Sequence, residues 1–230
     1  SGYIADMIED NYFENIINRY PKFLNLPEGL TSDEYLDILT KTYKSTDNSV
    51  EIVKKFIEGD SRFKLLLNEK HLSVASNWNL SKANNNSLAT KILCSDDVLY
   101  PHCLENQIKL LNEYKTSIVF NRRDILLPSG RKISPQTPSY VKTINANKAF
   151  AIYIKSGRNI FGEPVSALIR TKDLLESEGF SDSHQYTLDL SGYHEISKNK
   201  QVTFDKEIVE RKLQPQFQEF NNKYLEKIVK

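Results

Sequence analysis

The sequence has little of several features that would mark a specialised protein. Its 230 residues contain only two cysteines, Cys94 and Cys103, and four histidines. This is too few for a disulfide framework, and the spacing is not that of a zinc site. We interpret both cysteines as reduced and structural. No apolar run approaches the roughly 18 to 20 residues that cross a bilayer, and the first residues lack the pattern of a signal peptide. We therefore expect a soluble, cytoplasmic protein; peripheral membrane association stays open.

The chain also lacks an excess of charge of either sign. It has 31 basic and 30 acidic residues, a formal net charge of +1, and its basic residues occur in short scattered pairs such as Arg122-Arg123. A nucleic-acid partner requires a concentrated basic surface, so this balance argues against nucleic-acid binding. With 39% hydrophobic residues and no internal repeat, the chain is long enough for one sizeable core.

What is present is an alternation of strand-like and helix-like segments. Strands are expected at residues 34–41, 62–69 and 88–95, and helices along the apolar stripe Val50, Val53 and Ile57 and over residues 73–83. Asn48 and Glu51 have capping-box spacing before the first of these helices, and Gly59 supplies its end. The alternation predicts an α/β fold, with a mostly parallel, Rossmann-like sheet flanked by helices.

The second half of the chain is less regular. A helix with a core face of Leu104, Ile108 and Leu111 precedes an expected strand at 116–122 and a hairpin at 124–134, the apolar pattern is weak over 135–156, and a strand followed by a short helix is expected over 162–180. We expect residues 1–204 to form the domain and the polar residues 205–230 to be a C-terminal helical extension packed on it. A role of that extension as a partner helix stays open.

Two adjacent carboxylates, Asp96 and Asp97, follow the predicted strand at 88–95. In open α/β sheets, ligands bind outside the carboxyl ends of the strands. Neighbouring carboxylates repel unless a proton or a cation lies between them, and hard cations such as Mg²⁺ or Mn²⁺ prefer such oxygen ligands. The pair is therefore a candidate metal and phosphate site. The alternative is that one aspartate caps the helix near Pro101 or ends the strand in water.

Five segments occur in an order that is more specific than any one of them. They are "YKSTDNSVEIVKKF", "RFKLLLNEKHLSVASNWNLSKA", "ILCSDDVLYPHCLE", "NIFGEPVSALIRTKDLL" and "YTLDLSGYHEI", and with their connections they span roughly residues 36–196. In this order they resemble the family-2 glycosyltransferases, which have the GT-A fold. The resemblance implies transfer of a sugar from a nucleotide-diphosphate donor, first of all a UDP-sugar, to a glycan or other hydroxyl acceptor. It further implies inversion of the configuration at the anomeric carbon, a Mg²⁺ or Mn²⁺ cofactor and a role in polysaccharide biosynthesis.

The resemblance also implies roles for the acidic residues. Asp96 and Asp97 correspond to the DxD-type site, which holds the divalent cation and the donor diphosphate. Ser95 and Asp47 are implied to contribute to donor binding.

Asp189, in "YTLDLSGYHEI", corresponds to the general base that deprotonates the acceptor hydroxyl. Such a base must lie within hydrogen-bond reach of the acceptor. The alternative is that Asp189 is a polar residue at a helix start, and Glu195 is a weaker candidate for the same role.

Three further residues are candidates for substrate binding. Glu163 falls in the loop that resembles the lining of the donor and acceptor pocket, and contact with a sugar hydroxyl or a solvent-facing turn both stay open. Arg170 ends a predicted strand and is a candidate phosphate ligand. Trp78 is a candidate sugar platform, although its place in a helix favours the core.

Two departures from the family pattern favour an alternative function. Members usually begin with a hydrophobic strand ending in a Pro-x-Tyr-Asn-like turn, whereas Ser1 to Glu9 resemble the helix that follows it; we expect the first strand to be absent from this sequence. Members commonly carry Asp-Asp-Gly where this chain has Thr42, Tyr43 and Lys44, so the acidic residue that recognises uracil or ribose is missing. The alternative is a catalytically inactive domain that binds a glycan or a protein; a nucleotidyltransferase-like enzyme is a weaker third hypothesis.

Overall fold

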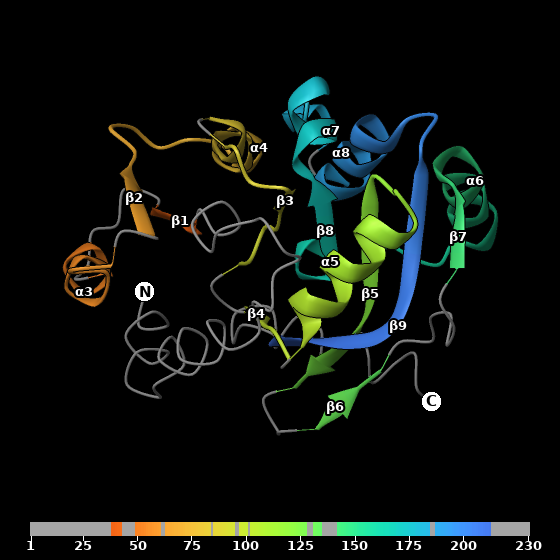
Figure 1. Ribbon diagram of the computed structural model, residues 1–230, viewed down its shortest axis with the longest axis horizontal. Helices are drawn as coiled ribbons and strands as arrows, with labels where there is room; N and C mark the ends of the chain where they lie inside the picture. Colours follow the sequence, from red (N-terminus) through yellow and green to blue (C-terminus); the bar gives the residue numbers. More distant parts are fainter. Residues whose placement is uncertain are drawn as a thin grey trace.

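A sheet between two layers of helices forms the centre of the computed structural model (Figure 1). The structure describes residues 38–42, 49–60, 63–83, 85–94, 97–100, 102–127, 131–134, 142–184 and 187–212. The helices are α3 (Ser49–Phe56), α4 (Val74–Asn79), α5 (Cys103–Glu113), α6 (Ala146–Ser156), α7 (Thr171–Glu176) and α8 (Leu188–Ser197). Short 3-10 turns are η2 (Leu80–Lys82), η3 (Pro164–Ser166) and η4 (Asp182–His184).

The described strands form two sheets. β1 (Ile38–Thr42) and β2 (Phe63–Leu67) pair in parallel as a small sheet of their own. The larger sheet consists of β3 (Ala89–Thr90), β4 (Asp97–Val98), β5 (Ile118–Leu126), β6 (Lys132–Ile133), β7 (Lys142–Asn145), β8 (Ala167–Arg170) and β9 (Gln201–Lys212). Its order is β3-β8-β5-β9-β4, with β6 paired to β5 and β7 paired to β9.

The larger sheet is mixed rather than mostly parallel. Among its described strands, only β5 and β9 run in parallel, whereas β3–β8, β5–β8, β4–β9, β5–β6 and β7–β9 are antiparallel. The prediction of a mostly parallel sheet is therefore wrong: it rested on the alternation of strands and helices, and this alternation does not determine the direction in which distant strands such as β5 and β8 pair. The expectation of an α/β fold with flanking helices is confirmed.

The two faces of β5 pack against different helices. Ile118 and Phe120 belong to the main core with residues of α6, α7 and α8, whereas Val119 packs with Leu111 of α5 on the opposite face. This follows from the alternation of side chains along a strand. The Phe120 ring lies 5.1 to 5.5 Å from the rings of three other aromatic side chains, namely Phe161, Tyr193 and Phe204.

Most expected elements lie in their predicted places, but the strand expected at 88–95 is much shorter. Only Ala89–Thr90 pair with β8. The side chain of Lys91 accounts for the early end, because its Nζ donates to the Ala167 carbonyl of β8 at 3.1 Å and to Oε1 of Gln107 at 2.9 Å. Lys91 therefore takes a β8 carbonyl that a longer β3 would face.

Two elements, β7 and α6, lie in the range 135–156, where the weak apolar pattern predicted no regular structure. Ala149 and Phe150 of α6 are buried in the main core. The pattern is blurred because Ile152 and Ile154 lie on the exposed side of the same helix, so apolar residues occur all round it.

The prediction of a helix over residues 205–230 is wrong for residues 205–212, which are a strand. These residues continue β9, which pairs with β5 and crosses the predicted boundary after residue 204. The apolar pair Ile208 and Val209 is β-branched, and pairing with a distant strand outweighs the local helical pattern. Residues 213–230 and the helix expected at the N-terminus lie outside the described residues. Within the described residues, no helix has the length and apolar character needed to span a membrane.

Replacing Phe120 by alanine should lower the free energy of unfolding by about 3–5 kcal/mol, because it opens a cavity among packed rings. Urea denaturation followed by circular dichroism measures the change. Ile154→Ala is the control, since this side chain is 75% exposed and its loss should cost less than about 0.5 kcal/mol. Equal losses in both variants would contradict the central place of Phe120.

Candidate functional site

Asp97 opens the short strand β4 at the edge of the larger sheet. The strand pairs with the end of β9, with Asp97 opposite Arg211. Asp97 is only 2% exposed, and its backbone amide donates to the Cys94 carbonyl at 3.1 Å. Asp97 is therefore a buried residue at the start of β4 and not one that ends a strand in water.

Three predicted donor-binding residues, Ser95, Asp96 and Asp47, lie outside the described residues. So do Tyr43 and Lys44 of the altered nucleotide-base segment.

Asp189 lies in the first turn of α8, as the helix-start interpretation expects. Its Oδ1 accepts a hydrogen bond from the Leu190 amide at 2.8 Å. The positive end of the helix dipole favours a charged carboxylate at this position. Asp189 is half-buried, and its anchored carboxylate suits a group that accepts a proton in a fixed place.

Three of the predicted acidic residues lie near the hydroxyl of Tyr193. Tyr193 follows Asp189 by one helical turn, on the same face of α8. Burial raises the pKa of Tyr193 well above its ordinary value, and the charges of Asp189, Cys94, Glu163 and Asp97 raise it further, in that order. Asp97, Asp189 and Glu163 therefore all lie near the Tyr193 hydroxyl, although they come from three separate parts of the chain.

Glu163 is held in a tight turn before β8. Its carboxylate pairs with the guanidinium of Arg123, and their side chains are 21% and 7% exposed. The Ser166 amide donates to the Glu163 carbonyl at 2.8 Å. Gly162 has a φ of +80°, and a Cβ there would overlap the Ser166 hydroxyl, so the turn requires glycine. Glu163 is therefore an oriented, half-buried group and not a solvent-facing turn residue.

Two basic residues, Arg123 and Lys91, lie near these carboxylates, and the sequence did not single out either as a site residue. Arg123 belongs to one of the short basic pairs of the sequence and is only 6% exposed within β5, whereas Lys91 is partly buried. Burial lowers the pKa of Lys91, while the nearby Cys103 and Asp97 oppose the shift. In the sequence, Lys91 is notable only because it interrupts the apolar run "LATKILC".

Arg170 and Trp78 are not brought to this cluster. The Arg170 guanidinium donates to the carbonyls of Thr116 at 3.0 Å and Leu111 at 2.5 Å, at the far end of β8 from Glu163. These bonds fix the connection between α5 and β5. Trp78 packs edge-on against Phe180, with ring centroids 5.2 Å apart, on the border of the main core.

The described residues could supply only part of the coordination shell of a metal ion, and a ligand and water would have to supply the rest. Among them, no group of three or more histidine, cysteine, aspartate or glutamate side chains is arranged to hold a metal. Mg²⁺ usually takes one or two carboxylates and completes its shell with phosphate oxygens and water. The buried carboxylate of Asp97, next to Asp96 in the sequence, fits that donor set for Mg²⁺ or Mn²⁺ bound together with a diphosphate.

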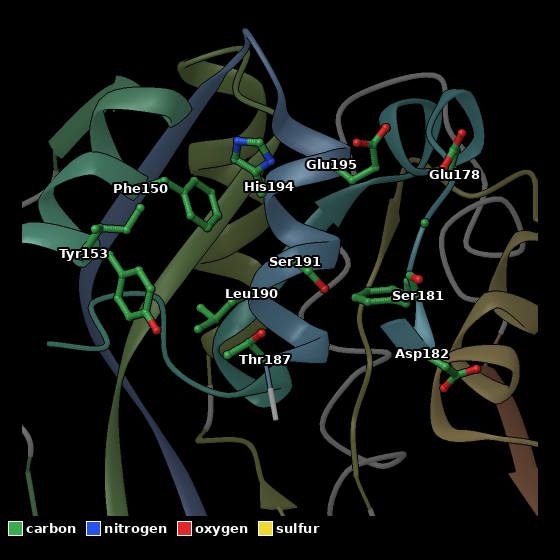
Figure 2. Close-up of a pocket in the computed structure, with 13 residues that line it drawn as sticks. Phe150, Tyr153, Glu178, Ser181, Asp182, Thr187, Leu190, Ser191, His194 and Glu195 are labelled. Carbon is green, nitrogen blue, oxygen red and sulfur yellow. The ribbon is translucent and has the colours of Figure 1, made fainter. Parts of the chain in front are cut away.

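A cavity of about 870 Å³ lies on the other side of α8. Figure 2 shows Leu190 and His194 of α8 on the side of Phe150 and Tyr153 of α6, and Ser191 and Glu195 of α8 on the side of Glu178 and Ser181; all line the cavity. At 3.6 residues per turn, these α8 positions lie on the face away from Asp189. Glu195, the weaker candidate for the base, is therefore separated from Asp97 and Glu163.

Comparison with known proteins gives a family and a fold. The family model "Glycosyl transferase family 2" matches residues 43–176, a range that includes Asp97 and Glu163 and ends before Asp189. The crystal structure of S. aureus TarS 1–349 is similar at a TM-score of 0.63 and 16% identity, over 85% of this chain and 55% of that chain. No curated protein sequence matches the chain.

Two further structures of the same TarS fragment carry ligands. The complex with UDP-GlcNAc matches at a TM-score of 0.63 and 16% identity, over 86% of this chain and 54% of that one. The complex with UDP matches at 0.61 and 16%, over 81% and 54%. At this identity the likeness shows the fold, GT-A, and this chain spans about half the length of the structures it matches.

Glu163→Gln should lower the free energy of unfolding by about 1–3 kcal/mol, because the buried Arg123 loses its counter-charge. Chemical denaturation at neutral pH measures the loss. Glu176→Gln is the matched control: that carboxylate is 54% exposed and reaches Lys172 and Lys200 only at 3.8 Å, so it should cost less than about 1 kcal/mol. A loss no larger for Glu163 than for Glu176 would contradict the buried pair.

Proposed function

Because the chain belongs to glycosyl transferase family 2, we propose that it transfers a sugar from a nucleotide-diphosphate donor to a hydroxyl acceptor with inversion. The observation that carries the proposal is that Asp97, Asp189 and Glu163, from separate parts of the chain, all lie near enough to Tyr193 for their charges to raise its pKa. A UDP-sugar is the proposed donor, supported by the TarS structures of similar fold with UDP-GlcNAc and UDP. A glycan is the proposed acceptor, which would make the protein part of polysaccharide biosynthesis.

We propose that the diphosphate end of the donor lies at Asp97. Asp97 and Asp96 would hold a Mg²⁺ or Mn²⁺ ion, with Ser95 and Asp47 contributing to donor binding. When bound, the cation would screen the negative charge that builds on the departing diphosphate. The chain itself fixes Asp97 through the β4–β9 pairing and the hydrogen bond to Cys94.

We propose that Asp189 takes the proton of the acceptor hydroxyl. The acceptor oxygen forms a bond to the anomeric carbon while the bond from that carbon to the diphosphate oxygen breaks. Attack from the side opposite the leaving group inverts the anomeric centre, and the proton ends on the Asp189 carboxylate. The hydrogen bond from the Leu190 amide keeps that carboxylate in place.

Glu163 would contact a hydroxyl of the sugar. Its ion pair with Arg123 orients the carboxylate before a ligand arrives, which limits the entropy lost on binding. We assign neither Arg170 nor Trp78 to the substrate, since the former bonds backbone carbonyls and the latter packs against the core.

Calorimetric titration of UDP-, GDP- and dTDP-sugars, with and without Mn²⁺, tests the donor site. The wild type should bind a UDP-sugar only with the metal, and Asp97→Asn should weaken that binding at least about tenfold, which corresponds to about 1.4 kcal/mol. Absence of metal-dependent binding for every nucleotide-sugar would contradict the enzyme proposal. It would favour the alternative of a catalytically inactive domain that binds a glycan or a protein.

Asp189→Asn should lower the transfer rate by about 10²–10⁴-fold, the usual contribution of a general base, while donor affinity stays nearly unchanged. Glu195→Gln is the matched control on the opposite face of the same helix and should transfer at the wild-type rate. Product formation from a UDP-sugar and calorimetry give the two readouts. Loss of transfer and donor affinity together would mean that Asp189 is structural.

A further inference from the structure

Tyr193, on the core-facing side of α8, carries a buried hydroxyl. The residue is 1% exposed, and its hydroxyl has no hydrogen-bond partner among the described residues. Removing a hydroxyl from water without a replacement bond costs about 1–3 kcal/mol. Buried polar groups of this kind are uncommon in folded proteins and call for an explanation.

The ring of Tyr193 is fixed by the core, so its hydroxyl has a defined position. Edge-on contacts hold the ring to Phe120 at 5.1 Å and to Phe180 at 6.4 Å between centroids. Side chains on a helix lean toward its N-terminus, so the ring extends toward the turn that carries Asp189. The hydroxyl is therefore aimed at the end of α8 where the proposed reaction takes place.

The groups around this hydroxyl determine what it can bind. Asp189, Cys94, Glu163 and Asp97 all lie close enough for their charges to act on it, and together with burial they keep the phenol protonated at neutral pH, because its pKa is raised. The Tyr193 hydroxyl is thus a hydrogen-bond donor that lies near carboxylates. It can donate to an oxygen of a ligand that binds near Asp97 and Asp189.

We propose that the Tyr193 hydroxyl donates a hydrogen bond to the sugar of the bound donor and is a specificity-determining residue of this site. The proposal rests on the proposed function, in which Asp97 marks the diphosphate and Asp189 the acceptor. The sugar of a nucleotide-sugar lies between those two ends. The hydrogen bond donated by the Tyr193 hydroxyl is therefore made to the sugar and not to the nucleotide.

Tyr193→Phe removes this hydroxyl and nothing else. Calorimetry with Mn²⁺ should show affinity for UDP-GlcNAc falling about tenfold, the value of one hydrogen bond of about 1.4 kcal/mol, while affinity for UDP stays unchanged. The midpoint of chemical denaturation without ligand should stay the same or rise, because an unpaired buried hydroxyl has been removed. Tyr153→Phe, on the α6 side of the cavity beyond α8, is the matched control and should change neither quantity.

Each other result contradicts the proposal in a distinct way. Equal weakening of UDP and UDP-GlcNAc would overturn the contact with the sugar. Unchanged affinity with a lower denaturation midpoint, or failure of Tyr193→Phe to fold, would make the hydroxyl structural. If the wild type binds neither ligand, the proposed function is wrong and the inference with it, whereas unaltered binding by Tyr193→Phe overturns the inference alone.

Discussion

The parallel pairing of β5 with β9 is the interaction on which the rest of the described structure depends. β5 lies between β8 and β9, and β9 also pairs with β7 and β4. Phe120 and Phe204 stand opposite each other in the pairing and stack at 5.5 Å. The register shifts between Phe120 and Arg122, where the apolar part of the strand pair gives way to polar side chains. The same pair of strands thus builds the core and supports the polar cluster beside it.

Helix α8 joins that core to the candidate site. Tyr193 and Ile196 face the main core, and Asp189 lies at the helix start on the same side. Gly192 lets the ring of Phe180 pack directly on the helix, since a Cβ there would overlap that ring. Because one short rigid element carries both the core contacts and Asp189, the position of the carboxylate depends on the packing of aromatic rings behind it.

Local patterns were enough to predict much of the fold. The stop at Gly59 and the core faces of α3 and α5 are short-range features, and the structure has them where the sequence placed them. The ordered blocks identified the family, and the resemblance implied the roles predicted for Asp97 and Asp189. Sequence alone contains no distances, so it could not show that Asp97, Asp189 and Glu163 lie near one hydroxyl. That arrangement depends on contacts between elements far apart in the chain.

The features that sequence missed are those where a distant partner reverses a local preference. Residues 205–212 read as helical but extend because β5 offers them an unpaired edge. Arg123 is a charged residue that becomes buried because it pairs with Glu163, and Lys91 becomes partly buried because Gln107 and the Ala167 carbonyl accept its hydrogen bonds. In the sequence, nothing distinguishes Tyr193 from the other tyrosines of the chain. Its unusual feature is the environment of a single atom, which no residue pattern encodes.

The place of β9 in the chain also sets the order in which the site can form during synthesis. β4 pairs with β9 at Arg211, so the strand that carries Asp97 lacks this partner until Arg211, more than 100 residues later in the sequence, has left the ribosome. Long-range pairings of this kind form late, because a long loop must be closed before the contact is gained. A nascent chain that stops before β9 would hold every acidic residue of the candidate site and lack the strand that positions the first of them. Competence for ligand binding would therefore arise only once β9 has paired with β4, and not by gradual growth.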